Sequence, residues 1–552
     1  MKTRFTILLA LAAALCFSSC EKHGLDFHWS DANLIVNLDI KSGIATRTAG
    51  DNEVDPTEEE SEISSVQLFL VAWDATNSKP ASNTPVIKIS DTGVDGNSVG
   101  ASVNLSGGDY LLYVIANCPT GLTLDLDSYD EFIGSYGEAA SSITNVNGSI
   151  TDVTKIWEDD NFMMVNSVDY NTGTGCYNGG VLVNFSNQNI TATVAMERVS
   201  AKVIADQDKF IDFSASMQKV LGPYDDVASE YVDYVISSAK IEAWALMNCV
   251  NSFNLIQKYT PDTKDFHKIL ASDDLKDVIV TPSSDGTKYP VAKKTAVPAT
   301  NLKSVGYYYT NPEFTGFNTT TNKPEYTELE FVDAGETLYC LENNPPYYPT
   351  TYTKNDGSTP TPAVSDSKMK GRATAVVFRA QILLADGFDA NAYTGSHDGT
   401  DPVGKDGTPG TWDDYPTKAY TTDLVRTIYE YKGKYYADAA RLKADNATLS
   451  SCADNAALRA AGVKVYENGY MYFTYYITNT GIPGCHAPYY SVERNKCYKL
   501  TVKAVSGLGD DLPCDYSHYD PEDPVDMAIP RLKVTVDVLP WKVKETVTYE
   551  IQ

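Results

Sequence analysis

Several stretches of the sequence hold residue types that could support catalysis or bind an ion. Residues 399–406 read GTDPVGKD, which is close to the phosphate-binding loop of nucleotide hydrolases. That loop needs Ser or Thr directly after its lysine to hold Mg²⁺, with a strand before it and a helix after it. Here Asp406 follows Lys405, and Pro402 interrupts the loop. The sequence therefore disfavours nucleotide binding.

Acidic and histidine residues give no stronger catalytic or metal-binding signal. Five aspartates in the same region lack the spacing of a calcium loop, which favours a solvated loop: Asp398, Asp401, Asp406, Asp413 and Asp414. The 6 histidines include no H-x-x-x-H pair, and no G-x-S-x-G motif occurs. We therefore expect no metal, no cofactor and no enzymatic activity, although a carboxylate pair for glycoside cleavage stays open in so acidic a chain.

The N-terminus resembles an export signal rather than a folded element. Lys2 and Arg4 precede an apolar stretch over residues 5–17, and small residues then lead to Cys20. This pattern predicts a lipoprotein signal in which Cys20 is lipidated, and the alternative is an ordinary secretory signal with an incidental cysteine. No later stretch is apolar for the roughly 18 residues that a membrane-spanning helix needs.

The cysteines agree with export but leave their pairing open. The chain has 10 cysteines, of which eight lie beyond residue 20, and none forms a C-x-x-C motif. Zinc and thioredoxin-type redox sites are therefore disfavoured, whereas an even number of cysteines in an exported protein permits disulfides. Cys485 and Cys497 flank a tyrosine-rich, hairpin-like stretch and are the first pair that we expect.

Composition indicates a large, acidic, globular protein. Its 552 residues suit two or three domains, and 43% are hydrophobic against 21% charged. The 44 Lys and Arg against 73 Asp and Glu give a net charge of −29. Because such a chain repels phosphate backbones, nucleic acid is disfavoured as a partner.

A strand precedes a candidate cleavage site near the N-terminus. Four apolar side chains alternate with polar ones, which predicts a half-buried strand: Leu34, Val36, Leu38 and Ile40. A flexible stretch with Arg47 and Thr48 comes next, and an acidic run over residues 51–62 follows it. A basic residue in such a small-residue loop is a candidate protease site, and Lys41 is a second basic residue nearby.

Strand patterns recur along the rest of the chain without the alternation of helices that a parallel sheet requires. Apolar or alternating runs cover residues 66–72, 110–117, 190–203, 237–247, 373–384, 469–478 and 496–505. This pattern predicts an all-β chain, with minor α, of two transthyretin-like β-sandwich domains that divide near residue 215.

The C-terminus also has strand character. Two alternating runs lie on either side of Pro540, and their apolar or aromatic residues are Val534, Val536, Val538, Trp541, Val543, Val547, Tyr549 and Ile551. A terminal strand of this kind needs a sheet edge, either in its own domain or in a neighbouring molecule.

Several motifs taken in order resemble those of a known family. They are YVIAN at 113–117, NFMM at 161–164, VAMERVSAKV at 194–203, VERNKCYKLTVKAV at 492–505 and VTVDVLPWKV at 534–543. Together with the lipoprotein signal, they resemble the Mfa-type fimbrillins of the Bacteroidales, which are major shaft subunits of the type V pilus. The resemblance touches both halves of the chain, and the C-terminal motif is its most specific part.

The resemblance implies how the chain is processed and assembled. Residues 1–20 would be the signal peptide, 21–47 a propeptide, 48–215 and 216–530 the two domains, and 531–552 the donor-strand region. A protease would cut after Arg47 and leave Thr48 first. Loss of the alternating strand at 34–40, here called the plug strand, would open a groove that the C-terminal strand of another subunit fills.

The resemblance also implies partners and location. The partners would be other copies of the chain, tip and anchor fimbrial subunits, and host or bacterial surface receptors, with the outer membrane reached through the lipid before processing. The location would be the fimbrium and the cell outer membrane, in adhesion and biofilm formation. Alternatives are a tip or anchor subunit, a monomeric surface lipoprotein that binds glycan or host protein, and a surface hydrolase.

Overall fold

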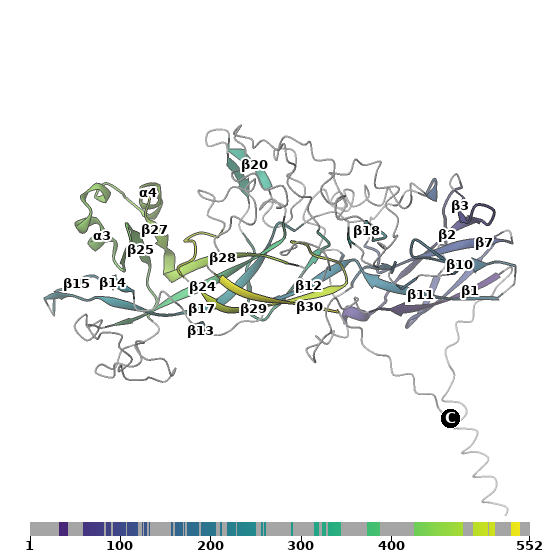
Figure 1. The fold of residues 1–552 in the computed structure, drawn as a ribbon, viewed down its shortest axis with the longest axis horizontal. Helices are drawn as coiled ribbons and strands as arrows, with labels where there is room; N and C mark the ends of the chain where they lie inside the picture. Colours follow the sequence, from purple (N-terminus) through teal and green to yellow (C-terminus); the bar gives the residue numbers. More distant parts are fainter. Residues whose placement is uncertain are drawn as a thin grey trace, which may run out of the picture.

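The computed structural model describes eleven parts of the chain, several of which contain short gaps. These parts are residues 32–41, 59–119, 124–132, 156–205, 210–260, 289–290, 314–343, 373–386, 424–478, 490–513 and 532–540. The described residues are mostly strands, with a few short helices. Figure 1 shows an elongated arrangement in which the early strands lie at one end, the last strand lies near the middle, and the short helices lie at the other end.

The N-terminal part is one 11-stranded sheet that folds over on itself. Its strands are β1 (Ala32–Ile40), β2 (Val66–Asp74), β3 (Lys79–Pro80), β4 (Ile87–Ile89), β5 (Thr92–Asp95), β6 (Ser98–Val103), β7 (Asp109–Ala116), β8 (Met164–Asn166), β9 (Cys176–Tyr177), β10 (Gly180–Asn184) and β11 (Asn189–Arg198). Its main path runs β3-β2-β7-β8-β11-β1-β6-β5. Inward side chains of β1, β6 and β11 share one core with those of β2 and β7, which is a sandwich.

The near-continuous apolar runs of β2 and β7 have a structural reason. Leu68 and Leu70 of β2 face the sandwich core, while Phe69 and Val71 face a second cluster with Tyr129. Both faces of these strands are therefore buried, so the alternation that marks a half-exposed strand disappears.

The C-terminal part is a second sandwich made of two sheets. The 4-stranded sheet has the order β23-β12-β29-β30, from β12 (Ser200–Ala205), β23 (Thr337–Leu341), β29 (Lys496–Val505) and β30 (Leu532–Pro540). The 9-stranded sheet contains β13 (Phe210–Ile211), β14 (Lys219–Leu221), β17 (Tyr234–Met247), β22 (Val332–Asp333), β24 (Ala375–Asp386), β25 (Ile428–Tyr431), β26 (Lys434–Tyr436), β27 (Lys464–Tyr466) and β28 (Tyr470–Tyr476). The two sheets share one core, in which Trp244 of β17, Phe378 of β24 and Leu500 of β29 are buried.

The structure confirms the predicted all-β class with two sandwiches. The chain passes from the first sheet into the second at Val199, between β11 and β12. The division near residue 215 stays a prediction, because the residues around it (212–217) lie outside the described part. Three further hairpins are β15 (Tyr224–Asp225) with β16 (Glu230–Tyr231), β18 (Tyr259–Thr260) with β19 (Tyr289–Pro290), and β20 (Phe314–Asn318) with β21 (Lys323–Tyr326).

A small helical cap closes one end of the second sandwich. It holds α3 (Ala439–Asp445), α4 (Asn455–Ala460) and the 3₁₀ turns η9 (Ala447–Leu449) and η10 (Glu467–Gly469). Each α-helix begins with an aspartate cap: the backbone N–H of Arg441 donates to Asp438, and that of Ala457 donates to Asp454.

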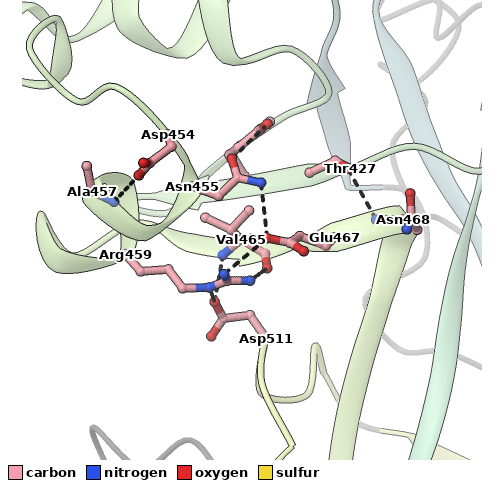
Figure 2. A network of polar contacts seen from close by, with 10 residues as sticks. Thr427, Asp454, Asn455, Ala457, Arg459, Val465, Glu467, Asn468 and Asp511 are labelled. Atoms are coloured by element: carbon pink, nitrogen blue, oxygen red, sulfur yellow. Dashed lines mark hydrogen bonds and ion pairs between the residues drawn. The ribbon is translucent and has the colours of Figure 1, made fainter.

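Arg459 fastens this cap to the sandwich (Figure 2). Its guanidinium contacts Asp511 at 3.0 Å and Glu467 at 3.1 Å, and its Nη2 donates to the carbonyl of Val465 at 2.7 Å. Because Asp511 also accepts from the backbone N–H of Val465, one carboxylate joins the cap to the segment that follows β29. The cap is therefore held by charge-assisted hydrogen bonds as well as by packing.

The predicted disulfide between Cys485 and Cys497 stays a prediction, because Cys485 lies outside the described residues. Cys497 lies in β29 as a buried free thiol and packs in the core of the first sandwich.

Candidate strand-exchange site

Strand β1 lies inside the first sheet, with a neighbour on each side. It pairs in parallel with β11, from Asn33 opposite Asn189 to Ile40 opposite Met196. On its other side it pairs antiparallel with β6, from Ala32 opposite Val103. Both edges of the strand are hydrogen-bonded, so removing β1 would leave two open edges facing each other.

The sequence of β1 matches this position residue by residue. The plug-strand residues face the core with no more than 6% exposure: Leu34, Val36, Leu38 and Ile40. Ile35, on the other face, is 44% exposed. The outer face also carries polar bonds, because Asn33 donates to the side chain of Asn189 at 2.7 Å. The predicted half-buried strand is therefore confirmed as an element, while its role in assembly stays a prediction.

The C-terminal end of β1 contacts the second sandwich. The backbone N–H of Lys41 donates to the carbonyl of Met196 at 2.8 Å. The carbonyl of Lys41 accepts from the side-chain amide of Asn495 at 3.1 Å. Asn495 directly precedes β29, and its backbone N–H donates to Ser200 of β12 at 2.7 Å. One asparagine thus connects the end of β1 to the sheet that carries β30.

The described chain resumes at Glu59, and its first residues are anchored independently of β1. Glu60, in the turn η1 (Glu59–Ser61), is fully buried. Its carboxylate accepts from Lys202 at 2.6 Å and from the hydroxyl of Tyr339 at 2.8 Å. Arg198 Nε donates to the Glu60 carbonyl at 2.7 Å. Burial lowers the pKa of Arg198 to about 10, against the opposing effect of Glu60.

This anchor determines what a cut at Arg47 would separate. Residues after the cut remain covalently joined to both sandwiches, and Glu60 holds their first described turn against strands of each. Among the described residues before the cut, β1 and Lys41 would be held by hydrogen bonds and packing alone. A cut there turns β1 into a non-covalent occupant of the sheet.

Strand β30 has a neighbour on one side only, among the described residues. It pairs antiparallel with β29, from Lys496 opposite Pro540 to Val505 opposite Leu532. Val536 is buried in the core of the second sandwich, and Val534 packs partly against it. Val538 pairs with Tyr498. The first run of the predicted donor region therefore belongs to its own sheet in this structure.

The remaining predicted site residues lie outside the described part of the chain. They are Cys20, Arg47, Thr48, Trp541, Val543, Val547, Tyr549 and Ile551. Within the described residues, no group of three or more His, Cys, Asp or Glu side chains is arranged to hold a metal ion. In the same residues, no helix is long and apolar enough to cross a membrane.

Sequence reasoning missed Glu60, Arg198 and Asn495 as junction residues. Glu60 lies in the acidic run over residues 51–62, where nothing in the sequence distinguishes it from its neighbours. Arg198 and Asn495 both lie in motifs that carried the family resemblance, at 194–203 and 492–505. Their place in these two motifs is a signal that could have drawn attention to them. It does not show that Arg198 and Asn495 are partners, because they lie 297 residues apart in the chain.

One family matches the part of the chain that contains β27 to β30. Residues 464–546 match the family described as "Major fimbrial subunit protein type IV, Fimbrillin, C-terminal". These residues are therefore similar to the C-terminal region of fimbrillins. The resemblance to fimbrillins is thereby confirmed, and it supports a role as a fimbrial subunit. No curated protein sequence matches the chain.

Distant solved structures include fimbrial and cell adhesion proteins. A fimbrilin from Porphyromonas gingivalis is 14% identical, with 93% of this chain and 99% of that chain covered and a TM-score of 0.32. The tip fimbrial protein Mfa3 from the same species is 10% identical, with 93% and 100% covered and a TM-score of 0.25. A cell adhesion candidate from Parabacteroides distasonis is 10% identical, with 93% and 100% covered and a TM-score of 0.41. The family match at residues 464–546 carries the assignment.

Proposed function

We propose that this fimbrillin is a shaft subunit of Mfa type that polymerises by strand exchange after proteolysis. It is exported as a lipoprotein through Cys20 and is cut after Arg47, which leaves Thr48 as the first residue. The plug strand then departs, and the C-terminal segment of another copy takes its place. The observation that carries this proposal is the position of β1, an interior strand whose described chain ends at Lys41, six residues before Arg47.

The energetics favour replacement over an empty groove. Each of the four buried side chains of β1 contributes roughly 1.5–3 kcal/mol on full burial, so an empty groove forfeits about 6–12 kcal/mol. Each ladder hydrogen bond adds roughly 0.5–1.5 kcal/mol. Ordering an incoming strand costs roughly 1–2 kcal/mol per residue. A donor strand with alternating apolar residues restores both the apolar burial and the ladder hydrogen bonds of the plug strand, whereas water restores no apolar burial.

The donor segment best suited to this exchange is the run after Pro540. Strand β30 already fills an edge position in its own sheet, so releasing it would uncover Leu500 and Val502 of β29. The run from Trp541 onward has apolar or aromatic residues at alternate positions apart from Glu545, so the proposal assigns the donor role to it. Head-to-tail donation between identical subunits is heterologous and produces an open filament rather than a closed dimer.

The proposed partners and location follow from assembly by strand exchange. The partners are other copies of the chain, tip and anchor fimbrial subunits, and surface receptors, and the location is the fimbrium and the outer membrane before processing. An anchor subunit would keep Arg47 uncut and Cys20 lipidated, so the state of Arg47 separates the two roles.

A controlled cut tests the proposal. Residues 21–552, which omit Cys20, would be expressed without lipid, treated with limited trypsin, and examined on unheated gels and by electron microscopy. We expect a ladder of oligomers and fibres only after cleavage. The matched control R47Q keeps Lys41 but should stay monomeric, and deletion of residues 541–552 should abolish the ladder in cut protein. A cut protein that has lost β1 and stays monomeric would overturn the shaft-subunit role, and glycan binding would then be tested.

A further inference from the structure

Two buried cysteines lie on facing sheets of the second sandwich. Cys249 follows β17 of the 9-stranded sheet, and Cys340 lies in β23 of the 4-stranded sheet. Both belong to the core that these sheets share, with exposures of 6% and 1%. The two thiols are close enough to hydrogen-bond to each other. The contact therefore joins the two layers of the sandwich.

Hydrogen bonds fix the two backbone segments beside each other. Thr374 Oγ1 donates to the carbonyl of Asn248 at 3.2 Å and accepts from the side-chain amide of Asn343 at 2.9 Å. Asn248 also donates to the carbonyl of Ala373 at 3.1 Å, and it adopts a φ of +59°. Asn248 precedes Cys249, and Asn343 lies three residues after Cys340. The two thiols therefore lie close together because hydrogen bonds hold their backbone segments in place.

The other described cysteines lie elsewhere. Cys118, Cys452 and Cys497 pack in three different clusters, none of which is the core shared by Cys249 and Cys340. Cys176 lies in β9 of the first sheet. The 249/340 pair thus differs from them by position and not only by burial.

We propose that Cys249 and Cys340 form a disulfide that joins the two sheets of the second sandwich. The chemistry is exchange with an oxidised dithiol carrier of the exported compartment. Each cysteine loses its proton, a sulfur–sulfur bond forms between the two, and the carrier's disulfide takes up two electrons and two protons to become two thiols. The proposal rests on export, which is part of the proposed function, and goes beyond it.

Burial indicates when the exchange takes place. Contact with the Cys249 thiol and burial raise the pKa of the Cys340 thiol well above its ordinary value, so the folded protein presents little thiolate to a carrier. The bond therefore forms before the core closes and is then protected from reduction. It closes a loop of about 90 residues, which is long enough for a large effect on the unfolded chain.

Peptide mapping tests the proposal without cleavage or polymerisation. The full chain, unfolded and reduced, would be refolded with oxidised glutathione, its remaining thiols blocked by alkylation, and its peptides analysed by mass spectrometry. We expect a linked peptide pair containing Cys249 and Cys340, with Cys118 and Cys497 alkylated. The same linkage is expected in protein recovered from the exporting cell. Alkylated Cys249 and Cys340 in both samples, or linkage of either to another cysteine, would overturn the proposal.

Thermal unfolding gives an independent readout. Reduction should lower the melting temperature of the wild type by about 5–15 °C. C249S, C340S and the double variant should all lose about the same amount and should become insensitive to reductant. C118S is the matched control and should keep the response to reductant. Equal melting temperatures of oxidised and reduced wild type would also count against the bond. Because neither assay involves Arg47 or fibres, failure here leaves the polymerisation scheme untouched, and failure of polymerisation leaves this result intact.

Discussion

The two terminal strands of the described chain have the same kind of sequence but opposite positions. Strands β1 and β30 are each nine residues long and carry apolar residues at every second position. β1 is enclosed by β6 and β11, whereas β30 has β29 alone among the described strands. An enclosed strand leaves a groove when it departs, and an edge strand leaves only a longer edge. Position in the sheet, and not apolar content, therefore makes β1 the candidate for replacement.

The largest expected effect comes from a charge placed on the inner face of β1. V36D puts a carboxylate between Val99 and Ala192, where the side chain is fully buried. We expect a loss of at least about 5 kcal/mol in the unfolding free energy of the first sandwich, because no partner is available for the charge. I35D is the matched control one residue away and should stay within about 1 kcal/mol. Urea unfolding measures both, and equal losses would contradict the enclosed position of β1.

The next effect tests whether the chain after the cleavage site is anchored independently of β1. E60A removes the partner of buried Lys202 and should cost about 3–5 kcal/mol. A double-mutant cycle with K202A should show strong coupling between the two. The response of E60A to limited trypsin is the second readout, since the cut form should release its new N-terminal segment more readily than the wild type. Additive losses in the cycle would mean that the ion pair does not hold this turn.

A smaller effect is expected at the edge strand. V536A removes two methyl groups from the side chain that β30 buries in the second core, and should cost about 1–2 kcal/mol. V534A, whose side chain is only partly buried, should cost less. The pair is measured by urea unfolding beside V36A. If V536A costs more than V36A, the contrast between enclosed and edge strands is wrong.

The smallest effect is a dependence on pH at the boundary of the two cores. Burial raises the pKa of the Cys497 thiol from 9.0 to about 12. A raised folded-state pKa means that the folded protein keeps a proton that the unfolded chain releases, so this contribution is complete below pH 9 and declines as pH rises from 9 to 12. C497A should therefore lose about 1 kcal/mol less stability than the wild type between pH 8 and pH 10. Parallel urea curves at the two pH values measure this difference.

Much of the fold was predictable because strand patterns are local. The alternation at residues 34–40 predicts β1, and the buried run at 110–117 predicts β7, since side-chain period reports which faces are covered. Residues 432–443 contain two kinds of element in the structure, β26 and then α3. In that segment Asp438 caps the helix, and this local signal could have placed the boundary.

The contacts of Glu60 and the nearness of Cys249 to Cys340 were not predictable from local patterns. Glu60 reads as one more carboxylate in an acidic run, and only the fold brings Lys202 and Tyr339 to it. Cys249 and Cys340 are separated by about 90 residues, so no spacing rule selects them. Contacts between distant segments depend on sheet order, which local patterns leave open.

The direction in which the strands run has a consequence for the polarity of any filament. Strand β1 runs parallel to β11 and ends at Ile40, next to Lys41, which accepts a hydrogen bond from Asn495. Strand β30 ends at Pro540, opposite Lys496. The chain beyond Pro540 therefore starts at the inner end of its own groove. Its dozen or so residues could extend about 40 Å, which is enough to lie along that groove.

If a subunit's own C-terminal tail filled this groove, the tail would run in the opposite direction to β1. A subunit's own tail would enter antiparallel to β11 and parallel to β6, the opposite of the pattern that β1 makes with them. A donor that enters from the outer end restores the native pattern. In the proposed assembly, strand direction therefore distinguishes a monomer that has filled its own groove from a filament in which every subunit points the same way.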